Sequence, residues 1–267
     1  MLVDGCYEGK VALVTGGGSG MGRAMAQEFA RLGAAVAVAG RRPEPLEDTV
    51  ALIADAGGRA VAVPTDVRNP EQVDAMVATA VEQLGRLDVL VNNAAGNFVV
   101  KAEELSPNGW RAVVSIVLDG GWLCTSAAGR QMIAQGEGGA ICSVIASYAW
   151  TGGPGTVHSA SAKAGLLAMT KTLAVEWAPH NIRVNTICPG PTDTEGAGGA
   201  LWPTADDRAR VEATVPAGRL ASVEEIGWWT TALCSPFAAY ITGTNLTIDG
   251  GHSLEQDGYM PAWQPRA

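Results

Sequence analysis

A glycine-rich turn near the amino end constrains the fold of this chain more than any other feature. Lys10 to Thr15 (KVALVT) is a short apolar, β-branched run, which predicts a buried strand. Gly16 to Gly22 follows directly, and apolar residues recur at helical spacing from Gly20 to Leu32. Glycines at such a junction let the backbone approach a pyrophosphate closely, and the helix amino terminus supplies free N–H groups. The turn therefore predicts a nucleotide-binding unit.

Strands and helices alternate along the remaining chain. Further strands are predicted by apolar runs at Ala35–Ala39, Ala60–Pro64, Val89–Val91, Ala140–Ser143, Ile182–Ile187 and Thr244–Ile248. Helices are predicted at Pro45–Ala56, from Pro70 onward behind an Asn69 cap, at Asn108–Met132, at Thr156–Trp177, and after a capping box of Ser222 and Glu225. This alternation predicts an α/β fold, a seven-stranded parallel sheet with helices on both faces.

A single domain is expected to span residues 1–267, because neither a linker nor a repeat interrupts the alternation. Two segments are exceptions. The loop at 192–207 is rich in glycine and other small residues, and in a compact domain a loop of that length predicts a lid or a disordered segment; a mobile substrate loop is expected here. Residues 252–267 are expected to form a carboxyl-terminal tail.

Charge and cysteine usage restrict the partners and the compartment. The formal net charge is −9 and the pI about 4.8, which argues against a nucleic-acid or anionic-membrane partner. No apolar run approaches the length of a membrane span, and the amino end lacks the pattern of a signal peptide. The five cysteines are scattered and the three histidines have no ligand-like spacing. Reduced thiols, a cytoplasmic location and no metal site are therefore expected.

The motifs together resemble the short-chain dehydrogenase/reductase family. Its marks occur in order as Thr15–Gly22, Asn92–Gly96, Lys163, Pro189–Gly190 and Asp249–Gly251. The resemblance implies a Rossmann-type domain, a nicotinamide dinucleotide and commonly a homotetramer. It implies cofactor contacts at Gly16, Gly18, Ser19, Gly20, Met21, Gly22, Arg41, Asp66, Val67, Asn93, Ala94, Gly96, Lys163, Pro189, Gly190, Pro191 and Thr192.

The end of the second predicted strand indicates which dinucleotide is used. An acidic side chain there would bond the ribose hydroxyls of NAD, but the chain has Gly40-Arg41-Arg42. Arginine can hold a 2′-phosphate through charge-assisted, bidentate hydrogen bonds. NADP(H) is therefore predicted, with Arg41 as the main contact. The alternative is that both arginines are a solvated surface pair. For Asp66, the alternative to a contact with the cofactor is that it only forms a turn.

The usual catalytic residues of the family are mostly missing. Common members use an Asn, a Ser, a Tyr and a Lys. Matched by motif, these positions are about Val117, about Ala146, Ser159 and Lys163, so only the lysine remains. Either the site is inactive or it has been rebuilt.

A rebuilt site is what the 2,4-dienoyl-CoA reductases have, and this chain resembles them more closely than the family in general. The similar stretches include Asn92–Phe98 (NNAAGNF), Ser159–Gly165 (SASAKAG) and Gly218–Leu220. In those enzymes the tyrosine precedes the helix, fifteen positions before the lysine, as Tyr148 precedes Lys163. The resemblance implies catalytic roles for Tyr148, Asn97, Ser159 and Lys163. It also implies an acyl-CoA substrate, with contacts at Arg68, Phe98 and Ser106.

The residues alone leave alternatives open. Each catalytic candidate also has a purely structural interpretation. Tyr148 is then a packing aromatic, Asn97 shapes its loop, Ser159 bonds its own backbone and Lys163 is an ordinary surface lysine. The functional alternatives to dienoyl-CoA reduction are a reductase of 3-oxoacyl or 2-enoyl thioesters, and a non-catalytic NADP-binding protein.

Overall fold

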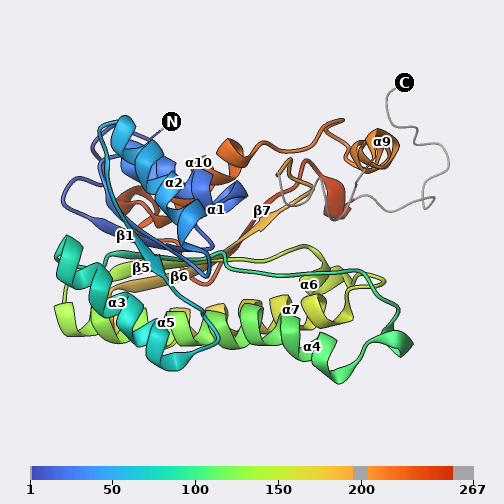
Figure 1. The fold of residues 1–267 in the computed structure, drawn as a ribbon, viewed down its shortest axis with the longest axis horizontal. Coiled ribbons are helices and arrows are strands. Elements are labelled where there is room, and N and C mark those ends of the chain that lie inside the picture. Colours follow the sequence, from blue (N-terminus) through green and yellow to red (C-terminus); the bar gives the residue numbers. More distant parts are fainter. Residues whose placement is uncertain (1, 195–203, 255–267) are drawn as a thin grey trace.

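A computed structural model describes residues 2–194 and 204–254. Its seven parallel strands form one sheet in the order β3-β2-β1-β4-β5-β6-β7 (Figure 1). The strands are β1 Val11–Thr15, β2 Ala35–Gly40, β3 Arg59–Pro64, β4 Val89–Asn92, β5 Gly139–Val144, β6 Ile182–Pro189 and β7 Asn245–Ile248. The helices are α1 Gly20–Arg31, α2 Pro43–Asp55, α3 Pro70–Leu84, α4 Pro107–Val114, α5 Gly120–Gln135, α6 Tyr148–Thr151, α7 Val157–Glu176, α9 Ala205–Ala213 and α10 Val223–Cys234.

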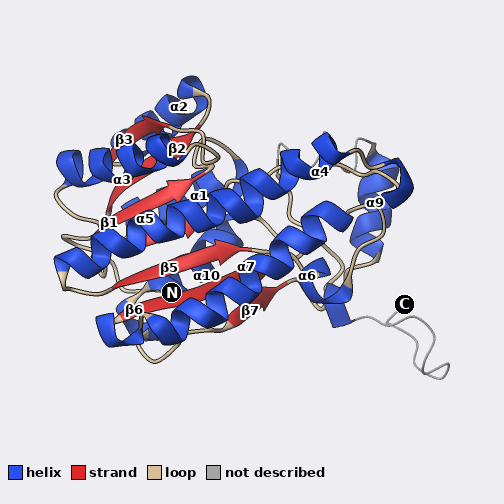
Figure 2. Ribbon diagram, turned by 90° about the horizontal axis from the view of Figure 1, so that it is seen from below, coloured by secondary structure: helices blue, strands red, loops and turns tan. Residues whose placement is uncertain are grey.

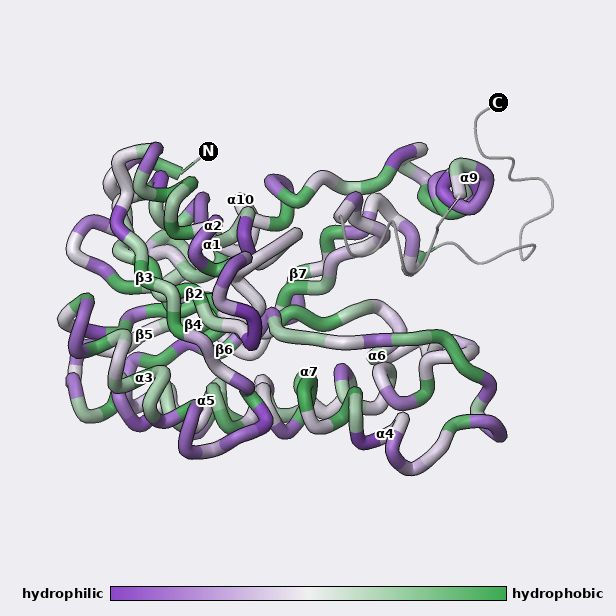
Figure 3. The backbone as a smooth tube through the Cα atoms, viewed as in Figure 1, coloured by the Kyte–Doolittle hydropathy of each residue, from purple (hydrophilic) through white to green (hydrophobic). Residues whose placement is uncertain are grey.

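Helices cover both faces of the sheet. Helices α1, α2 and α10 lie on one face, and α3, α5 and α7 lie on the other (Figures 1 and 2). The alternation of side chains along a strand produces both interfaces. Ala12 and Val14 of β1 pack with Phe29 of α1, whereas Val11 and Leu13 belong to the cluster on the opposite face. The apolar strands in the middle of Figure 3 are therefore buried on two sides.

The direction in which strands are added reverses between β1 and β4. From β1 the chain builds outward through β2 and β3, and it then returns to add β4 on the other side. This strand order is that of a Rossmann-type domain, and a crevice forms at the carboxyl ends of the strands where the order reverses. Helices α4, α6 and α9 project beyond that end of the sheet (Figure 2). The predicted α/β class, the seven strands and the two helical layers are confirmed.

Helix starts follow local sequence signals. The Asn69 side chain accepts a hydrogen bond from the Gln72 backbone N–H and caps α3, with Pro70 in the first turn. Ser222 and Glu225 form the predicted capping box of α10. The predicted long helix Asn108–Met132 is found as the continuous helical run Pro107–Gln135, in which a π-helical turn at Ser115–Asp119 separates α4 from α5.

The stretch Pro107–Gln135 is long and apolar enough to cross a membrane by length and composition alone. Half of its most apolar window is buried within the fold, where α5 packs on the sheet and contributes Cys124 and Met132 to the core. Its apolar character is accounted for by this packing. The prediction that no run approaches span length overlooked this helix.

The two segments set apart from the domain are described only in part. The predicted loop 192–207 ends earlier than expected, because α9 begins at Ala205. Residues 195–203 of that loop and residues 255–267 of the tail lie outside the described residues, so the lid and the tail stay predictions.

Asp88 joins three strands at the end of the sheet opposite the crevice. Its carboxylate accepts hydrogen bonds from the Val11 backbone N–H (2.9 Å), from two nitrogens of Arg86 (both 2.7 Å) and from Lys10 (3.2 Å). Its backbone bonds to Val11 of β1 and to Ala140 of β5. With only 7% of the residue exposed, this carboxylate fixes the start of β1 beside the start of β4, and the Asp88 backbone adds the bond to β5.

We expect Asp88→Ala to lower the free energy of unfolding by about 2 kcal/mol, because it leaves the buried Val11 N–H and the partly buried Arg86 guanidinium without their charged acceptor. Urea unfolding followed by circular dichroism measures this. Asp74→Ala is the control: Asp74 pairs with Arg130, but both side chains are 62% exposed, so the loss should stay below about 1 kcal/mol. Equal effects of the two substitutions would contradict the structural role assigned to Asp88.

Candidate active site

A cleft of about 570 Å³ opens at the carboxyl ends of the central strands. It gathers residues from the glycine turn, the end of β2, the segment after β3, the segment after β4 and the start of α6. Fourteen of the residues predicted for cofactor binding or catalysis line it: Gly16, Gly18, Ser19, Gly20, Met21, Gly22, Arg41, Asp66, Val67, Asn93, Ala94, Gly96, Asn97 and Tyr148. The structure thus brings together most of the predicted site.

The glycine turn is built for close approach. Gly16 has a φ of +65°, which strains any residue with a side chain. Gly22 lies so near the turn that a Cβ there would be 2.1 Å from the Gly16 carbonyl oxygen and 2.6 Å from Asn93 Nδ2. Only glycine at position 22 lets the first turn of α1 pack onto the loop. The amino terminus of α1 therefore faces the cleft with its backbone N–H groups near the surface.

Side chains hold this turn in place. The Thr15 hydroxyl accepts hydrogen bonds from the backbone N–H groups of Asn93 and Ala94 (both 3.0 Å), and Asn93 Nδ2 donates to the Thr15 and Gly16 carbonyl oxygens (3.0 and 3.2 Å). Arg23 donates to the Gly18 carbonyl oxygen at 2.6 Å. Arg23 is a site residue that the sequence motifs did not indicate, because an arginine in the first turn of a helix is usually solvated.

Asp66 and Arg68, two residues predicted to contact ligands, pair with each other in the segment after β3. Arg68 pairs with both oxygens of Asp66, with Nε at 2.9 and 3.1 Å. The hydrogen bonds from Arg68 are the main reason why the pKa of Asp66 falls to about 2, with a smaller contribution from the charge of Arg41. Asp66 is therefore an anion at neutral pH. Arg68, predicted to contact acyl-CoA, lies outside the cleft lining and its guanidinium is engaged by this pair.

Tyr148, the first residue of α6, lines the cleft with a polar side chain. Its hydroxyl lies 3.0 Å from the Ser159 hydroxyl, across the loop that joins α6 to α7. Burial raises the pKa of Tyr148, which keeps the side chain in its protonated phenol form. Ser159 is 1% exposed, and its hydroxyl is bonded to Tyr148, so the alternative in which it bonds its own backbone is not what the structure shows.

Lys163 lies one helical turn after Ser159 and is buried. Its ammonium donates to the Val144 carbonyl oxygen at 2.5 Å, and the residue is only 6% exposed. Burial lowers the pKa of Lys163 to about 8. The alternative of an ordinary surface lysine is wrong. Cys188 is close enough to interact electrostatically with Lys163, but burial raises the pKa of that thiol to about 12 and keeps it neutral.

Asn97 lies in the exposed segment after β4 and lines the cleft. Its amide oxygen accepts a hydrogen bond from the Phe98 backbone N–H at 3.0 Å. This bond directs the oxygen to the protein and leaves the amide N–H₂ group as a donor. A carboxamide donor and a phenol donor therefore line one cleft.

The other predicted residues lie around the cleft without lining it. Ser106 caps α4, where its hydroxyl oxygen accepts from the Gly109 backbone N–H. Phe98 is 39% exposed and packs beside α4 and α7. The segment Pro189–Thr192 begins at the last residue of β6 and lies at the edge of the sheet where the strands have their carboxyl ends. Val117, at the position of the usual family Asn, is buried in an apolar cluster, so no polar group replaces that side chain there.

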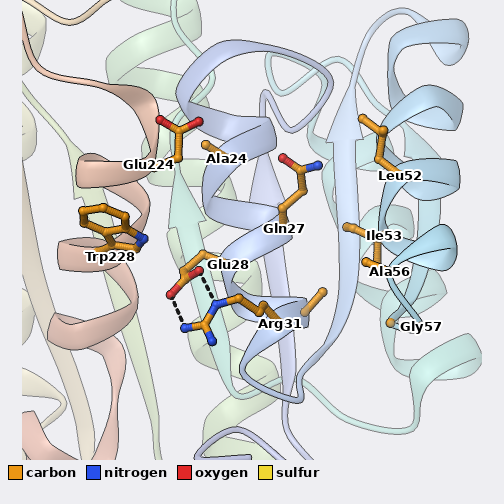
Figure 4. A pocket seen from close by; sticks show the side chains of 12 residues that line it. Ala24, Gln27, Glu28, Arg31, Leu52, Ile53, Ala56, Gly57, Glu224 and Trp228 are labelled. Atoms are coloured by element: carbon orange, nitrogen blue, oxygen red, sulfur yellow. Dashed lines mark hydrogen bonds and ion pairs between the residues drawn. The ribbon is translucent and has the colours of Figure 1, made fainter. Parts of the chain in front are cut away.

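A second hollow of about 420 Å³ lies between α1, α2 and α10 (Figure 4). Its charged residues include Glu28 and Arg31, which pair with each other at 2.8 Å. None of the predicted site residues lines it. Within the described ranges 2–194 and 204–254, no group of three His, Cys, Asp or Glu side chains is placed to hold a metal ion. The chemistry of the described chain is therefore concentrated in the first cleft.

Comparison with known proteins agrees with this geometry. A family model described as enoyl-(acyl carrier protein) reductase matches residues 16–253. A Bacillus subtilis protein named a probable 2,4-dienoyl-CoA reductase that produces a (2E)-enoyl-CoA is 47% identical over 248 residues, which cover 92% of this chain and 98% of that protein. A Caenorhabditis elegans protein named probable 2,4-dienoyl-CoA reductase 3, producing a (3E)-enoyl-CoA, is 38% identical and covers 98% of this chain and 88% of its own length.

A solved structure of a short-chain dehydrogenase has the same fold as this chain. A short-chain dehydrogenase from Bacillus anthracis superposes with a TM-score of 0.86 at 47% identity, covering 94% of this chain and 99% of that one. With the family model matching residues 16–253 and this relative sharing the fold at 47% identity, the chain belongs to the short-chain dehydrogenase/reductase family.

Proposed function

We propose that this protein is an NADPH-dependent reductase of 2,4-dienoyl-CoA thioesters. The contact between the hydroxyls of Tyr148 and Ser159, one helical turn from the buried Lys163, is the observation that carries the proposal. It supplies a phenol where the family tyrosine is missing. The names of the B. subtilis and C. elegans relatives support the same substrate class.

The cleft fits a dinucleotide. Glycine at positions 16 and 22 lets the turn and the amino terminus of α1 pack tightly together and line the cleft with backbone, which suits a pyrophosphate. Arg41 at the end of β2 would hold the 2′-phosphate, and Asp66 the adenine end. Val67, Asn93, Ala94 and Gly96 would line the path to the reacting end, with Pro189–Thr192 beside it. When bound there, NADPH supplies the hydride.

Tyr148 and Asn97 would stabilise the charge that develops on the substrate. Hydride addition to carbon 5 of the diene moves an electron pair through the conjugated system to the thioester oxygen. A phenol O–H and an amide N–H aimed at that oxygen form an oxyanion hole. The raised pKa of Tyr148 favours this role, because the side chain must keep its proton in order to donate it. Ser159 would orient the phenol by donating to its oxygen.

Lys163 would keep positive charge beside this oxyanion hole and bond the nicotinamide ribose. Within the described part of the chain its ammonium bonds the neutral Val144 carbonyl oxygen and no carboxylate, which leaves its charge available to the site. Arg68, Phe98 and Ser106 are proposed to contact the acyl-CoA at the outer edge of the cleft.

The reaction would end when a water molecule donates a proton to a carbon of the dienolate and leaves hydroxide. Addition at carbon 4 of the dienolate leaves a 2-enoyl product, and addition at carbon 2 leaves a 3-enoyl product. We assign the (2E)-enoyl-CoA product to this chain, because the relative named for that product is 47% identical and the one named for the (3E) product is 38% identical. No alkoxide is formed, so the proton donor of ketone reductases is not required.

A homotetramer acting in the cytoplasm completes the proposal. All five cysteines are free thiols, which suits a reducing compartment. Trp228 and Trp229 on α10 are half exposed, as is Trp122 on α5, and large aromatic residues are enriched at interfaces. These faces are the proposed contacts between subunits.

Turnover of NADPH with 2,4-hexadienoyl-CoA tests the function, and Tyr148→Phe tests the site. We expect consumption of NADPH with the diene but not with 3-oxoacyl or 2-enoyl thioesters. Loss of one oxyanion donor should lower kcat about 10²–10³-fold, while the Kd for NADPH stays unchanged. Tyr240→Phe, at a fully exposed tyrosine, is the control. Normal turnover by Tyr148→Phe would contradict the assignment, and chromatography of the product identifies the remaining double bond.

Arg41→Gln should raise the KM for NADPH by roughly 10- to 100-fold, because a charge-assisted hydrogen bond to the 2′-phosphate is lost. The KM for NADH should change little, since NADH lacks that phosphate. Steady-state kinetics with both cofactors measures the difference. A parallel change for NADH and NADPH would mean that Arg41 does not recognise the phosphate. Arg59→Gln serves as the control, since Arg59 lies at the opposite end of β3 and bonds the Gln83 carbonyl oxygen.

Activity should fall as pH rises through about 8, where the buried ammonium of Lys163 loses its proton. The lowered pKa means that the charged, active form is complete only below this range. The pH profile of kcat/KM for NADPH reports the free enzyme. Lys163→Arg stays charged across the range, so it should shift the fall to higher pH even if its maximal rate is lower. A profile that stays flat to pH 9.5 would contradict the role of the charge.

A further inference from the structure

His158 is a fully buried residue that the mechanism so far does not use. It lies in the first turn of α7, directly before Ser159, and is 0% exposed. Neither ring nitrogen has a hydrogen-bond partner within the described part of the chain. Buried polar atoms are nearly always paired, so an unpaired imidazole requires an explanation. The absence of bonds to Tyr148, Ser159 or Lys163 argues against a role as acid or base.

The ring of His158 contacts the ring of Phe98. The two ring centroids are 4.5 Å apart and the planes are inclined at 79°, so that the edge of one ring meets the face of the other. This arrangement is the favourable one for aromatic pairs. Phe98 directly follows Asn97, and its backbone N–H is the donor that orients the Asn97 amide. The histidine therefore acts through its ring on the residue that holds Asn97.

The segment 97–100 has further attachments to the same region. The Val100 backbone N–H donates to the Gly155 carbonyl oxygen at 3.0 Å. Val99 packs so closely on Gly155 that a Cβ there would lie 2.9 Å from the Val99 side chain. Phe98 also packs beside Gly109 of α4, where a Cβ would be 3.2 Å from the ring. The segment is thus held between α4 and the loop that leads into α7.

We propose that His158 is a positioning residue for Asn97, acting through Phe98. The inference rests on the proposed function, in which Asn97 and Tyr148 form the oxyanion hole. The first turn of α7 then controls both donors: Ser159 bonds the phenol of Tyr148, and His158 packs the segment that carries Asn97. A fixed separation of the two donors is what preorganised stabilisation of charge requires.

Substitutions separate the ring from its nitrogens. His158→Ala removes the ring and should lower kcat with 2,4-hexadienoyl-CoA by about 10- to 100-fold, because Asn97 is misplaced. His158→Phe keeps an aromatic ring and should retain kcat within about threefold, since edge-to-face packing on Phe98 remains possible. His158→Gln keeps polar nitrogens without a ring and should behave like His158→Ala. Wild-type kcat in His158→Gln, or complete loss in His158→Phe, would overturn the proposal.

A double-mutant cycle tests whether the effect passes through Asn97. In an Asn97→Ala background, His158→Ala should change kcat by less than about twofold, because residues acting as one unit are not additive. A further tenfold loss would contradict the proposal. The KM for NADPH should stay within about twofold of wild type in every variant. Thr170→Val is the matched control for His158→Ala and should leave kcat unchanged. Thr170 is equally buried on α7, and its hydroxyl is also unpaired.

Hydrogen exchange distinguishes this proposal from the function it rests on. If the wild-type protein reduces no dienoyl-CoA, the proposed function fails, and mass spectrometry of the peptide containing Val99 and Val100 still tests His158. His158→Ala should raise the exchange of the Val100 amide, whose hydrogen bond to Gly155 depends on the docked segment, and His158→Phe should not. Unchanged exchange in His158→Ala would overturn the positioning role by itself.

Discussion

The hydrogen bonds between Thr15 and Asn93 are the constraint on which the site depends. They tie the end of β1 to the end of β4, on the two sides of the point where the strand order reverses. The glycine turn and the segment bearing Asn97 leave the sheet from these two places. Parallel strands bring their carboxyl ends to one edge of the sheet. The Thr15–Asn93 pair therefore fixes the distance between the glycine turn, where the cofactor is proposed to bind, and the Asn97 segment, where the substrate is proposed to bind.

In the proposed function the catalytic chemistry has been moved rather than lost. Ser159 stands where the resemblance places the family tyrosine, and Tyr148, in the one-turn helix before α7, places a phenol 3.0 Å from its hydroxyl. Burial raises the pKa of this phenol and lowers the pKa of Lys163. Both shifts suit a site that donates hydrogen bonds to a developing oxyanion, since the phenol keeps its proton while the lysine retains its charge up to about pH 8.

The first turn of α7 connects the parts of this arrangement. Ser159 bonds Tyr148, Lys163 follows one turn later, and His158 packs on Phe98. A rigid helix is a more accurate support than a loop for groups that must keep their separation. The proposed donors come from a one-turn helix (Tyr148) and a loop (Asn97), and contacts with one end of α7 hold both segments.

The sequence by itself determined the alternation of strands and helices, the glycine turn and the separation of Tyr148 from Lys163, because each of these is a local pattern. It did not determine the hydrogen bonds between Thr15 and Asn93 or the burial of His158 against Phe98. Those features depend on which side chains meet after the sheet has assembled. Packing between segments far apart in the chain, which no periodicity encodes, decided them.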